Sequence, residues 1–295
     1  MPLFPDFRRV DIAVDGARIH AVVGPPCDGP AVLLLHGYPQ THAIWHKIAP
    51  RLSARFNVVC ADLRGYGDSS RPETAADHSP YSKRAMALDQ VQLMRALGHE
   101  RFRLAGHDRG GRVAHRLAAD HPHAVERLAV LDIAPTLAMY EQTGEAFARA
   151  YWHWFFLILP APVPEKMIGA DPLFLLRAKM ATGSTGMNPF EAEAWSEYER
   201  CFTPEMIHAS CEDYRAAASI DLEHDRADRA EGRRVRAPVL ALWGANGVIE
   251  RCFNPLDEWR RVADDVRGSA LPAGHYLPEE VPDLVAGELE RFFSD

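Results

Sequence analysis

An aspartate between two glycines is the most informative candidate for chemistry in this sequence. Residues 106–110 read Gly-His-Asp-Arg-Gly, which places Asp108 between Gly106 and Gly110. An apolar run precedes the segment and a helix-like stretch follows it, so we expect the glycines to permit a sharp turn that exposes a nucleophile. A carboxylate in that position attacks a saturated carbon and forms an ester on the protein. Asp108 therefore predicts hydrolysis through a covalent aspartyl intermediate.

The second step of such a reaction needs a general base and an acid that orients the base. Among fourteen histidines, His275 lies in a loop after the apolar run 266–271, late in the chain where this base is expected. Asp132 ends another apolar run and is the expected acid, although a carboxylate there could also cap a turn or a helix. Glu250, displaced from the end of the following run, is the alternative acid.

Two arginines beside the nucleophile indicate the charge of the substrate. Arg109 follows Asp108 directly, and Arg112 lies one helical turn beyond the nucleophile on the same face. Two guanidinium groups would keep a neighbouring carboxyl ionised and would bind an anion, most simply a carboxylate, through bidentate hydrogen bonds. A lone helical arginine commonly forms a surface salt bridge instead, but the pair favours a site for a small anionic substrate.

Backbone N–H groups complete the expected site. Residues 36–39 read His-Gly-Tyr-Pro and follow the first long apolar run, where a loop would direct the N–H of Tyr38 into an oxyanion hole. The second N–H would come from Arg109, directly after the nucleophile. The chemistry assembled from these residues needs neither a metal nor an organic cofactor.

The composition is typical of a soluble protein with one large domain and an inserted element. The chain has 295 residues, of which 47% are hydrophobic and 25% charged, and its formal net charge of −8 argues against nucleic-acid binding. The most apolar run, 155–164, is too short to span a bilayer, and we find no secretory signal. Five cysteines without CxxC spacing are expected as free thiols. We therefore expect a cytoplasmic protein without membrane or nucleic-acid partners.

Apolar runs that alternate with helical patterns predict an α/β fold. A turn at Asp15 and Gly16 joins two runs into an expected hairpin, 9–14 and 17–23. Continuous apolar runs, typical of strands buried on both faces, occupy 31–35, 57–61, 102–105, 128–132 and 238–243, and helical patterns occupy 82–97 and 113–119. This alternation predicts a mostly parallel central sheet flanked by helices.

The sequence changes character between about residue 135 and residue 224. Tryptophans, tyrosines and a proline-rich segment, 160–164, replace the apolar runs, and the patterns there are helical. We therefore expect a helical cap over 135–224, inserted into a core domain made of 1–134 and 225–295.

Taken together, these residues resemble the fluoroacetate (haloacetate) dehalogenases of the α/β-hydrolase superfamily. The likeness covers nearly the whole chain and rests on the motifs 36–42, 106–113, 131–133, 153–154, 211–215 and 274–280. The resemblance implies an α/β-hydrolase fold with Asp108 as the nucleophile, His275 as the base and Asp132 as its partner. It also implies that Arg109 and Arg112 hold the substrate carboxylate. Because relatives are often dimers, a homodimer is expected.

The resemblance further assigns a halide pocket to the cap. In the family a cap histidine, the tryptophan after it and a later tyrosine form this pocket, and they match His153, Trp154 and Tyr214. Imidazole, indole and phenol each donate a hydrogen bond, so three converging donors would stabilise the charge growing on a departing halogen. Without the resemblance, His153 and Trp154 indicate only an aromatic core.

The chain departs from the family pattern in two places. Residues 182–186, Thr-Gly-Ser-Thr-Gly, are small where the family often has a bulky aromatic near the entrance, so we expect larger haloacids to enter. Tyr38 stands where phenylalanine is common and adds a hydroxyl near the substrate. Both changes leave the expected catalytic roles intact, while the halogen preference, chain length and stereochemistry of the substrate stay open.

The expected reaction converts a 2-haloacid into a 2-hydroxy acid and halide. An epoxide hydrolase is the alternative, because it would share the nucleophile and base but use two cap tyrosines to protonate the epoxide oxygen. Tyr214 could be one of them, and the other could be Tyr140, Tyr151 or Tyr198. Such an enzyme would not need the arginine pair. A non-catalytic hydrolase-fold protein that binds a small acid is a further alternative, which the retained nucleophile, base and acid disfavour.

Overall fold

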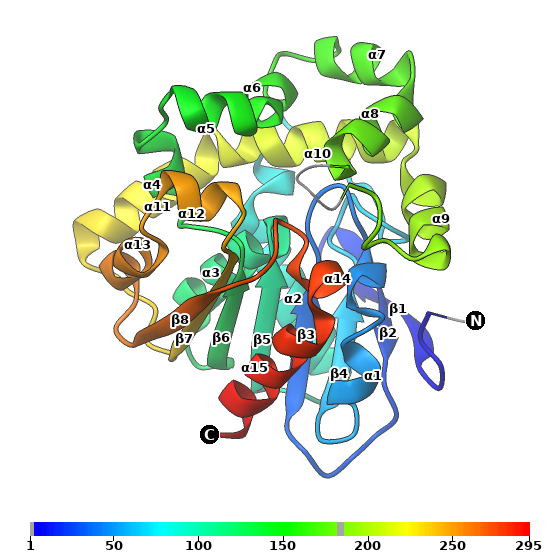
Figure 1. Cartoon of the computed structure of the whole chain (residues 1–295), viewed down its shortest axis with the longest axis vertical. Helices are drawn as coiled ribbons and strands as arrows, with labels where there is room; N and C mark the ends of the chain where they lie inside the picture. The colour runs from blue at the N-terminus through cyan, green and yellow to red at the C-terminus, as the bar shows by residue number, and fades with distance from the viewer. Residues whose placement is uncertain (1–2, 182–185) are drawn as a thin grey trace.

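One eight-stranded sheet forms the centre of the protein. The computed structural model describes residues 3–181 and 186–295, and its strand order is β1-β2-β4-β3-β5-β6-β7-β8 (Figure 1). The strands are β1 (Arg8–Val14), β2 (Ala17–Val23), β3 (Ala31–Leu35), β4 (Asn57–Ala61), β5 (Phe102–His107), β6 (Val125–Leu131), β7 (Val239–Gly244) and β8 (Val266–Leu271). The pairings β1–β2 and β2–β4 are antiparallel, and those from β4–β3 through β7–β8 are parallel. The predicted α/β fold with a mostly parallel sheet is confirmed.

The apolar runs locate the strands closely. Strands β2, β3 and β4 coincide with the predicted ranges, whereas β5 continues to His107 and β6 begins earlier, at Val125. In β3, Leu33 and Leu35 face one hydrophobic cluster while Val32 and Leu34 face another. Side chains alternate across a strand, so a continuous apolar run is what a sheet covered on both faces requires.

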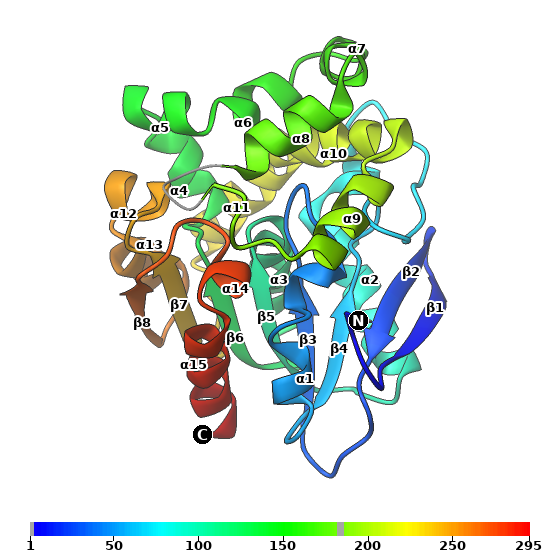
Figure 2. The same cartoon turned by 45° about the vertical axis from the view of Figure 1, so that its right-hand side comes forward.

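Helices cover both faces of the sheet, as Figures 1 and 2 show. The short α1 (Ala49–Leu52) and the C-terminal α15 (Pro282–Ser294) pack on one face, and α2 (Lys83–Ala96) and α3 (Arg109–Asp120) pack on the other. The remaining elements of this part are η1 (His42–Trp45), η2 (Ser79–Tyr81), α12 (Val248–Cys252), α13 (Pro255–Val262) and α14 (Leu277–Glu280).

Eight helices lie between β6 and β7 in the described chain. They are α4 (Thr136–Glu141), α5 (Glu145–Ala150), α6 (Trp152–Leu157), α7 (Val163–Gly169), α8 (Pro172–Met180), α9 (Ala192–Cys201), α10 (Pro204–Ala217) and α11 (Ile220–Glu231). Helices α5 to α10 gather above the sheet in both views (Figures 1 and 2). The predicted end of the inserted segment, residue 224, falls inside α11. No helix in the described residues combines the length and apolar character needed to cross a membrane.

The parallel strands bring the candidate residues to one edge of the sheet. Asp108 follows β5, Asp132 follows β6, and His275 follows β8, each at the carboxyl end of its strand. Tyr38 follows the neighbouring β3 in the same way. Its ring meets that of Tyr214, from α10, at a centroid distance of 5.4 Å. The inserted helices therefore cover the edge at which these loops meet.

Candidate active site

Asp108 occupies a strained turn between β5 and α3. Its φ of +46° and ψ of −115° are unusual for a residue with a side chain, so the aspartate itself makes the turn that we expected the glycines to make. The glycines permit close packing instead. A Cβ at Gly106 would lie 2.4 Å from the carbonyl oxygen of Gly110, and a Cβ at Gly110 would lie 2.3 Å from that of His36.

The surroundings of Asp108 keep its carboxyl ionised. The side chain is only 3% exposed, and its Oδ2 accepts a hydrogen bond from the backbone N–H of Tyr38 at 3.1 Å. Burial alone would raise the pKa of Asp108, but the charges of His275 and Arg112 hold it below its usual range. An ionised, poorly hydrated carboxylate is the form that attacks carbon.

The structure brings His275 and Asp132 together. The imidazole Nδ1 of His275 lies 2.6 Å from Oδ2 of Asp132, and the other oxygen of Asp132 accepts the N–H of Gly244 at 2.9 Å. Glu250, the alternative acid, instead accepts a hydrogen bond from the indole of Trp243. The geometry thus favours Asp132 over Glu250 as the group that orients the imidazole.

Two residues to which the sequence assigned no role hold the His275 loop. Glu280 accepts the N–H groups of Gly274 at 2.7 Å and Tyr276 at 2.9 Å, on either side of the histidine. His107 lies with Nε2 2.8 Å from the carbonyl oxygen of His275. Burial lowers the pKa of His107 to about 3, so a neutral ring donates this bond. Both residues lie within the motifs quoted above, but their types alone indicate no such function.

Arg109 and Arg112 are buried, and each leaves one guanidinium nitrogen without a partner. Asp213 accepts hydrogen bonds from Nε and Nη2 of Arg109 at 2.8 and 2.7 Å. Arg112 donates through Nη1 to Thr136 at 3.0 Å and contacts the sulfur of Met139 through Nη2. Only Nη1 of Arg109 and Nε of Arg112 are unpaired. Each arginine therefore has one guanidinium nitrogen free for a ligand, and a bidentate clamp by the pair of arginines stays a prediction.

The three cap residues of the expected halide pocket also lie together. The rings of His153 and Tyr214 are 5.9 Å apart, and those of Trp154 and Tyr214 are 6.4 Å apart. All three are buried, and Nδ1 of His153, Nε1 of Trp154 and the hydroxyl of Tyr214 have no hydrogen-bond partner. Burial, together with the nearby charge of Lys179, holds the pKa of His153 well below its usual value. The imidazole is therefore neutral.

The unpaired nitrogens of the arginines and the unpaired cap groups belong to one cluster. The guanidinium carbon of Arg109 lies 4.1 Å from the ring centroid of Tyr214, and that of Arg112 lies 4.6 Å from that of Trp154. Most buried polar atoms in native proteins have partners, so several unpaired donors around one carboxylate indicate a ligand site. Two buried cations among them favour an anionic ligand.

Lys179, on α8, is a further cation that the sequence did not indicate. Its ammonium lies 5.8 Å from the ring centroid of Tyr276, the residue that follows His275 in the chain. Lys179 forms no ion pair with another described residue. Burial lowers its pKa, while the carboxylates of Asp108 and Asp132 raise it. A lysine in a helix usually belongs to a solvated face, so only the packing of α8 reveals that Lys179 lies near the candidate site.

Residues 182–185, where we expected a wider entrance, lie outside the described residues.

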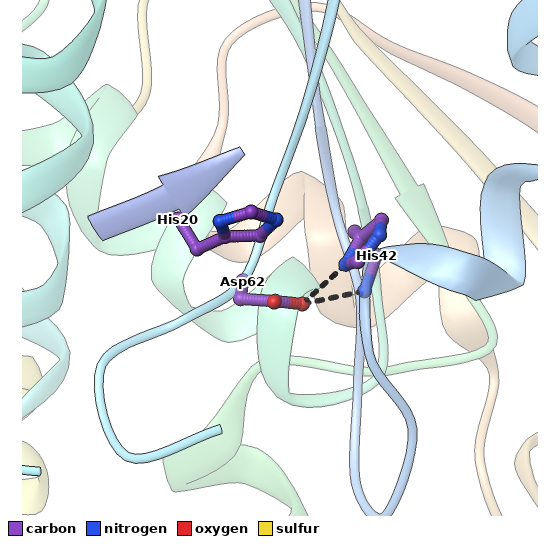
Figure 3. Close-up of side chains that lie close together, drawn as sticks. All are labelled: His20, His42 and Asp62. Atoms are coloured by element: carbon purple, nitrogen blue, oxygen red, sulfur yellow. Dashed lines mark hydrogen bonds and ion pairs between the residues drawn. The ribbon is translucent and has the colours of Figure 1, made fainter. Parts of the chain in front are cut away.

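Another cluster, His20, His42 and Asp62, has the residue types of a metal site (Figure 3). Its possible ligand atoms lie within 4.8 Å of one another. However, Asp62 Oδ1 accepts the backbone N–H of His42 at 2.7 Å and lies 2.9 Å from its Nδ1, and Oδ2 accepts the N–H of Asp68 at 2.9 Å. A metal would have to replace these bonds. The cluster is better explained as support for the loop that carries Tyr38.

Comparisons with known proteins agree with this geometry. Residues 30–276 match the model of the alpha/beta hydrolase fold family. The chain is 48% identical to a fluoroacetate dehalogenase from Burkholderia sp., over 99% of this chain and 96% of that protein. It is 33% identical to a soluble epoxide hydrolase from Corynebacterium sp. (strain C12), over 95% of each chain.

The fold has a near counterpart among solved structures. An α/β hydrolase from Nostoc sp. PCC 7120 superposes with a TM-score of 0.95 at 52% identity, over 98% of both chains. The chain therefore belongs to the α/β-hydrolase superfamily and, within it, to the fluoroacetate dehalogenase family.

Proposed function

We propose that the protein hydrolyses 2-haloacids, fluoroacetate among them, to 2-hydroxy acids and halide through an ester on Asp108. One observation carries the proposal: a buried, ionised carboxylate lies among two unpaired guanidinium nitrogens and three unpaired cap groups. A carboxylate nucleophile, a clamp for an anion and donors for a leaving halide are what this reaction needs. The similarity to a fluoroacetate dehalogenase supports the same substrate class.

In the first step, the substrate carboxylate binds to Arg109 and Arg112. Asp108 attacks the halogen-bearing carbon from the side opposite the halogen, so a carbon–oxygen bond forms as the carbon–halogen bond breaks. The halide leaves with the bonding electron pair. His153, Trp154 and Tyr214 would hydrogen-bond to it, which matters most for fluoride because a free fluoride ion is strongly hydrated.

In the second step, water cleaves the ester. His275, held by Asp132, accepts a proton as the water attacks the carbonyl carbon of Asp108. The N–H groups of Tyr38 and Arg109 would stabilise the tetrahedral oxyanion, and the existing hydrogen bond from Tyr38 to Asp108 supports this role. The imidazolium then returns its proton to the departing alkoxide, which releases the hydroxy acid. The Asp108 carboxyl loses the second proton of the water to solvent and is again ionised.

Epoxide hydrolysis is the second candidate, and the hydroxyls of two tyrosines favour it. Tyr140 and Tyr214 each have a buried hydroxyl without a partner, and an epoxide hydrolase would use such a pair to protonate the substrate oxygen. Tyr198 is not available in this way, because its hydroxyl bonds to Glu279 at 2.6 Å. The two buried arginines give no advantage with a neutral epoxide, so we rank this function second.

The decisive experiment measures halide release from fluoroacetate and chloroacetate by the native protein and by Arg112→Ala. We expect both halides from the native protein and a loss of at least about tenfold in the variant, because a charge-assisted hydrogen bond contributes about 1.5–3 kcal/mol. Chloride release alone would limit the activity to weaker carbon–halogen bonds. Release of neither halide, with turnover of a neutral epoxide, would contradict the proposal.

We also propose that helices α4 to α11 form a cap over the active site. We further propose that an apolar face of this cap joins two copies of the chain in a homodimer. Among the described residues, six of the eight exposed large apolar side chains lie between residues 152 and 174. They are Trp152, Leu159, Val163, Met167, Leu173 and Phe174. Apolar patches of this kind commonly mark interfaces. Light scattering should give the mass of a dimer, and Phe174→Lys should reduce it to a monomer whereas Leu88→Lys should not.

We further propose a cytoplasmic location, which the thiols support. All five cysteines are free, and unpaired thiols persist in a reducing compartment. Cell fractionation would test this location, and recovery of the protein outside the cytoplasm would contradict it.

A further inference from the structure

Asp213 is a buried cap carboxylate that reaches into the core and grips Arg109. It lies on α10 and is fully buried. Its carboxylate accepts Nε of Arg109 at 2.8 Å and Nη2 at 2.7 Å, and its backbone carbonyl accepts Nη2 at 2.9 Å. This fork-to-fork pairing fixes both the position and the plane of the guanidinium group.

The other side of Asp213 is held by two residues of the core. Lys83, at the start of α2, forms an ion pair with Oδ1, and the hydroxyl of Tyr66 donates to Oδ2 at 2.6 Å. Burial alone would raise the pKa of Asp213, but the cations of Arg109 and Lys83 keep it well below its usual range. Because Lys83 shares the carboxylate, Asp213 does not neutralise Arg109 alone.

This arrangement determines which atom of Arg109 is available to a ligand. Two of the three guanidinium nitrogens are occupied by Asp213, and Nη1 alone has no partner. The ring of Tyr214, next to Asp213 on the same helix, packs against the guanidinium group at 4.1 Å. A free arginine would have several rotamers, whereas this one presents a single unpaired nitrogen in a fixed position.

We propose that Asp213 is a positioning residue for the substrate carboxylate, which it serves by holding Arg109 so that Nη1 meets the anion. The inference rests on the proposed function only because it assumes that the substrate carries a carboxylate. Since α10 supplies the carboxylate and α3 the arginine, the affinity for the anion depends on the cap being docked on the core.

The test compares Asp213→Asn with a matched variant of the same helix, Glu212→Gln. Glu212 is also buried, but it bonds to Arg215 at 2.7 Å and lies 2.8 Å from the His78 ring, away from Arg109. Binding of glycolate, the anionic product of haloacetate hydrolysis, is measured by titration calorimetry, with neutral glycolamide as the isostere. Unfolding temperatures are recorded for each protein.

We expect Asp213→Asn to weaken glycolate binding by about tenfold or more, as for the loss of one well-placed charged hydrogen bond. Glycolamide binding should change less than about twofold, since an amide does not depend on the arginine charge. Glu212→Gln should leave both affinities near those of the native protein. An equal loss for both ligands, or an equal loss in Glu212→Gln, would show a general structural effect and overturn the proposal.

Asp213→Glu provides a second test if the asparagine variant does not fold. It keeps the negative charge but displaces the carboxylate, so a positioning role predicts weaker glycolate binding at an almost unchanged unfolding temperature. Full native affinity in this folded variant would overturn the proposal. Because binding is measured without turnover, a native protein that binds glycolate but releases no halide would contradict the proposed function and leave this inference standing.

Discussion

A fully buried carboxyl group loses its charge unless neighbouring groups stabilise the anion. At Asp108 that stabilisation comes from side chains of distant segments, chiefly His275 and Arg112, and from the N–H of Tyr38. Little water competes for the carboxylate, so it retains its nucleophilicity. The base lies against Asp132, whose two oxygens bind the imidazole and a backbone N–H. Without His275, Arg112 and the N–H of Tyr38 would still stabilise Asp108, so we expect that mutation can separate the two proposed reaction steps.

His275→Asn should stop the reaction after the first step. Arg112, Arg109 and the N–H of Tyr38 still stabilise the charge of Asp108, but no group accepts the proton of the attacking water. Incubation with chloroacetate should release at most one chloride per site and add the mass of the ester to the peptide that contains Asp108. Asp108→Asn is the control and should acquire no added mass. Normal turnover by His275→Asn would contradict the two-step scheme.

Tyr214→Phe should lower fluoride release more than chloride release. The substitution removes one unpaired donor from the proposed halide pocket, and loss of a preorganised donor commonly costs about 10²–10³ in rate. Chloride is a better leaving group, so its release should fall less. The matched variant is Tyr140→Phe, which removes the other unpaired hydroxyl near Trp154. An equal loss with both variants and both substrates would contradict a pocket built around Tyr214.

At the scale of elements, the site depends on how closely α3 approaches the sheet. Helix α3 begins at Arg109, four residues before the helical pattern predicted from the sequence. Two glycines in its first turn lower the helix propensity of this segment, but they allow the helix to pack closely against the sheet. At Gly110 the helix backbone lies against His36, with no room for a side chain. Close packing thus overrides propensity and brings the first turn of α3 against the end of β3 and His36.

Gly110→Ala should destabilise the protein by about 1–3 kcal/mol, the usual cost of overpacking a core. The new Cβ would lie 2.3 Å from a carbonyl oxygen, which cannot move without displacing β3 and its loop. Gly169→Ala, at the end of α7, is the control because a Cβ there meets nothing within 4 Å. It should be neutral or stabilise by a few tenths of a kcal/mol. Urea unfolding measures both, and equal stabilities would contradict the packing argument.

At the scale of the whole molecule, burial keeps several histidines neutral. Burial lowers the pKa of both His107 and His115 to about 3, and that of His153 also lies well below its usual value. The unfolded chain binds protons at these positions below pH 6.5, whereas the folded protein does not. Stability should therefore fall as the pH drops from 6.5 towards 3. His42 acts in the opposite direction: although burial lowers its pKa, Asp62 raises it above the usual value.

The free energy of unfolding should thus decrease between pH 7 and pH 5.5, by at most about 1.4 kcal/mol per pH unit for each such histidine. His115→Gln should make this dependence shallower, because it removes one of these groups on the side of α3 that faces Trp259. Urea titrations at several pH values provide the measurement. An unchanged slope in the variant would contradict the assignment.

The sequence by itself determined the class of fold and singled out Asp108 as the candidate nucleophile. Strands buried on both faces must be apolar, so β3 and β4 could be located to the residue, and the hairpin turn at Asp15 and Gly16 located β2 equally well. The position of a nucleophile in a strand–turn–helix segment depends on the local chain geometry, and neighbouring residues in the sequence determine that geometry. That is why Asp108 could be proposed as the nucleophile from a short motif.

Only the tertiary structure decided the partners of these residues. Asp132 and Glu250 were both candidates for the acid until the packing of β6 and β8 placed Asp132 on His275. An acidic residue in a helix usually indicates a solvated face, so nothing in the sequence marked Asp213 as the group that holds Arg109. Hydrogen bonds and charges act through space between segments far apart in the chain. Their pairing therefore follows from packing rather than from sequence spacing.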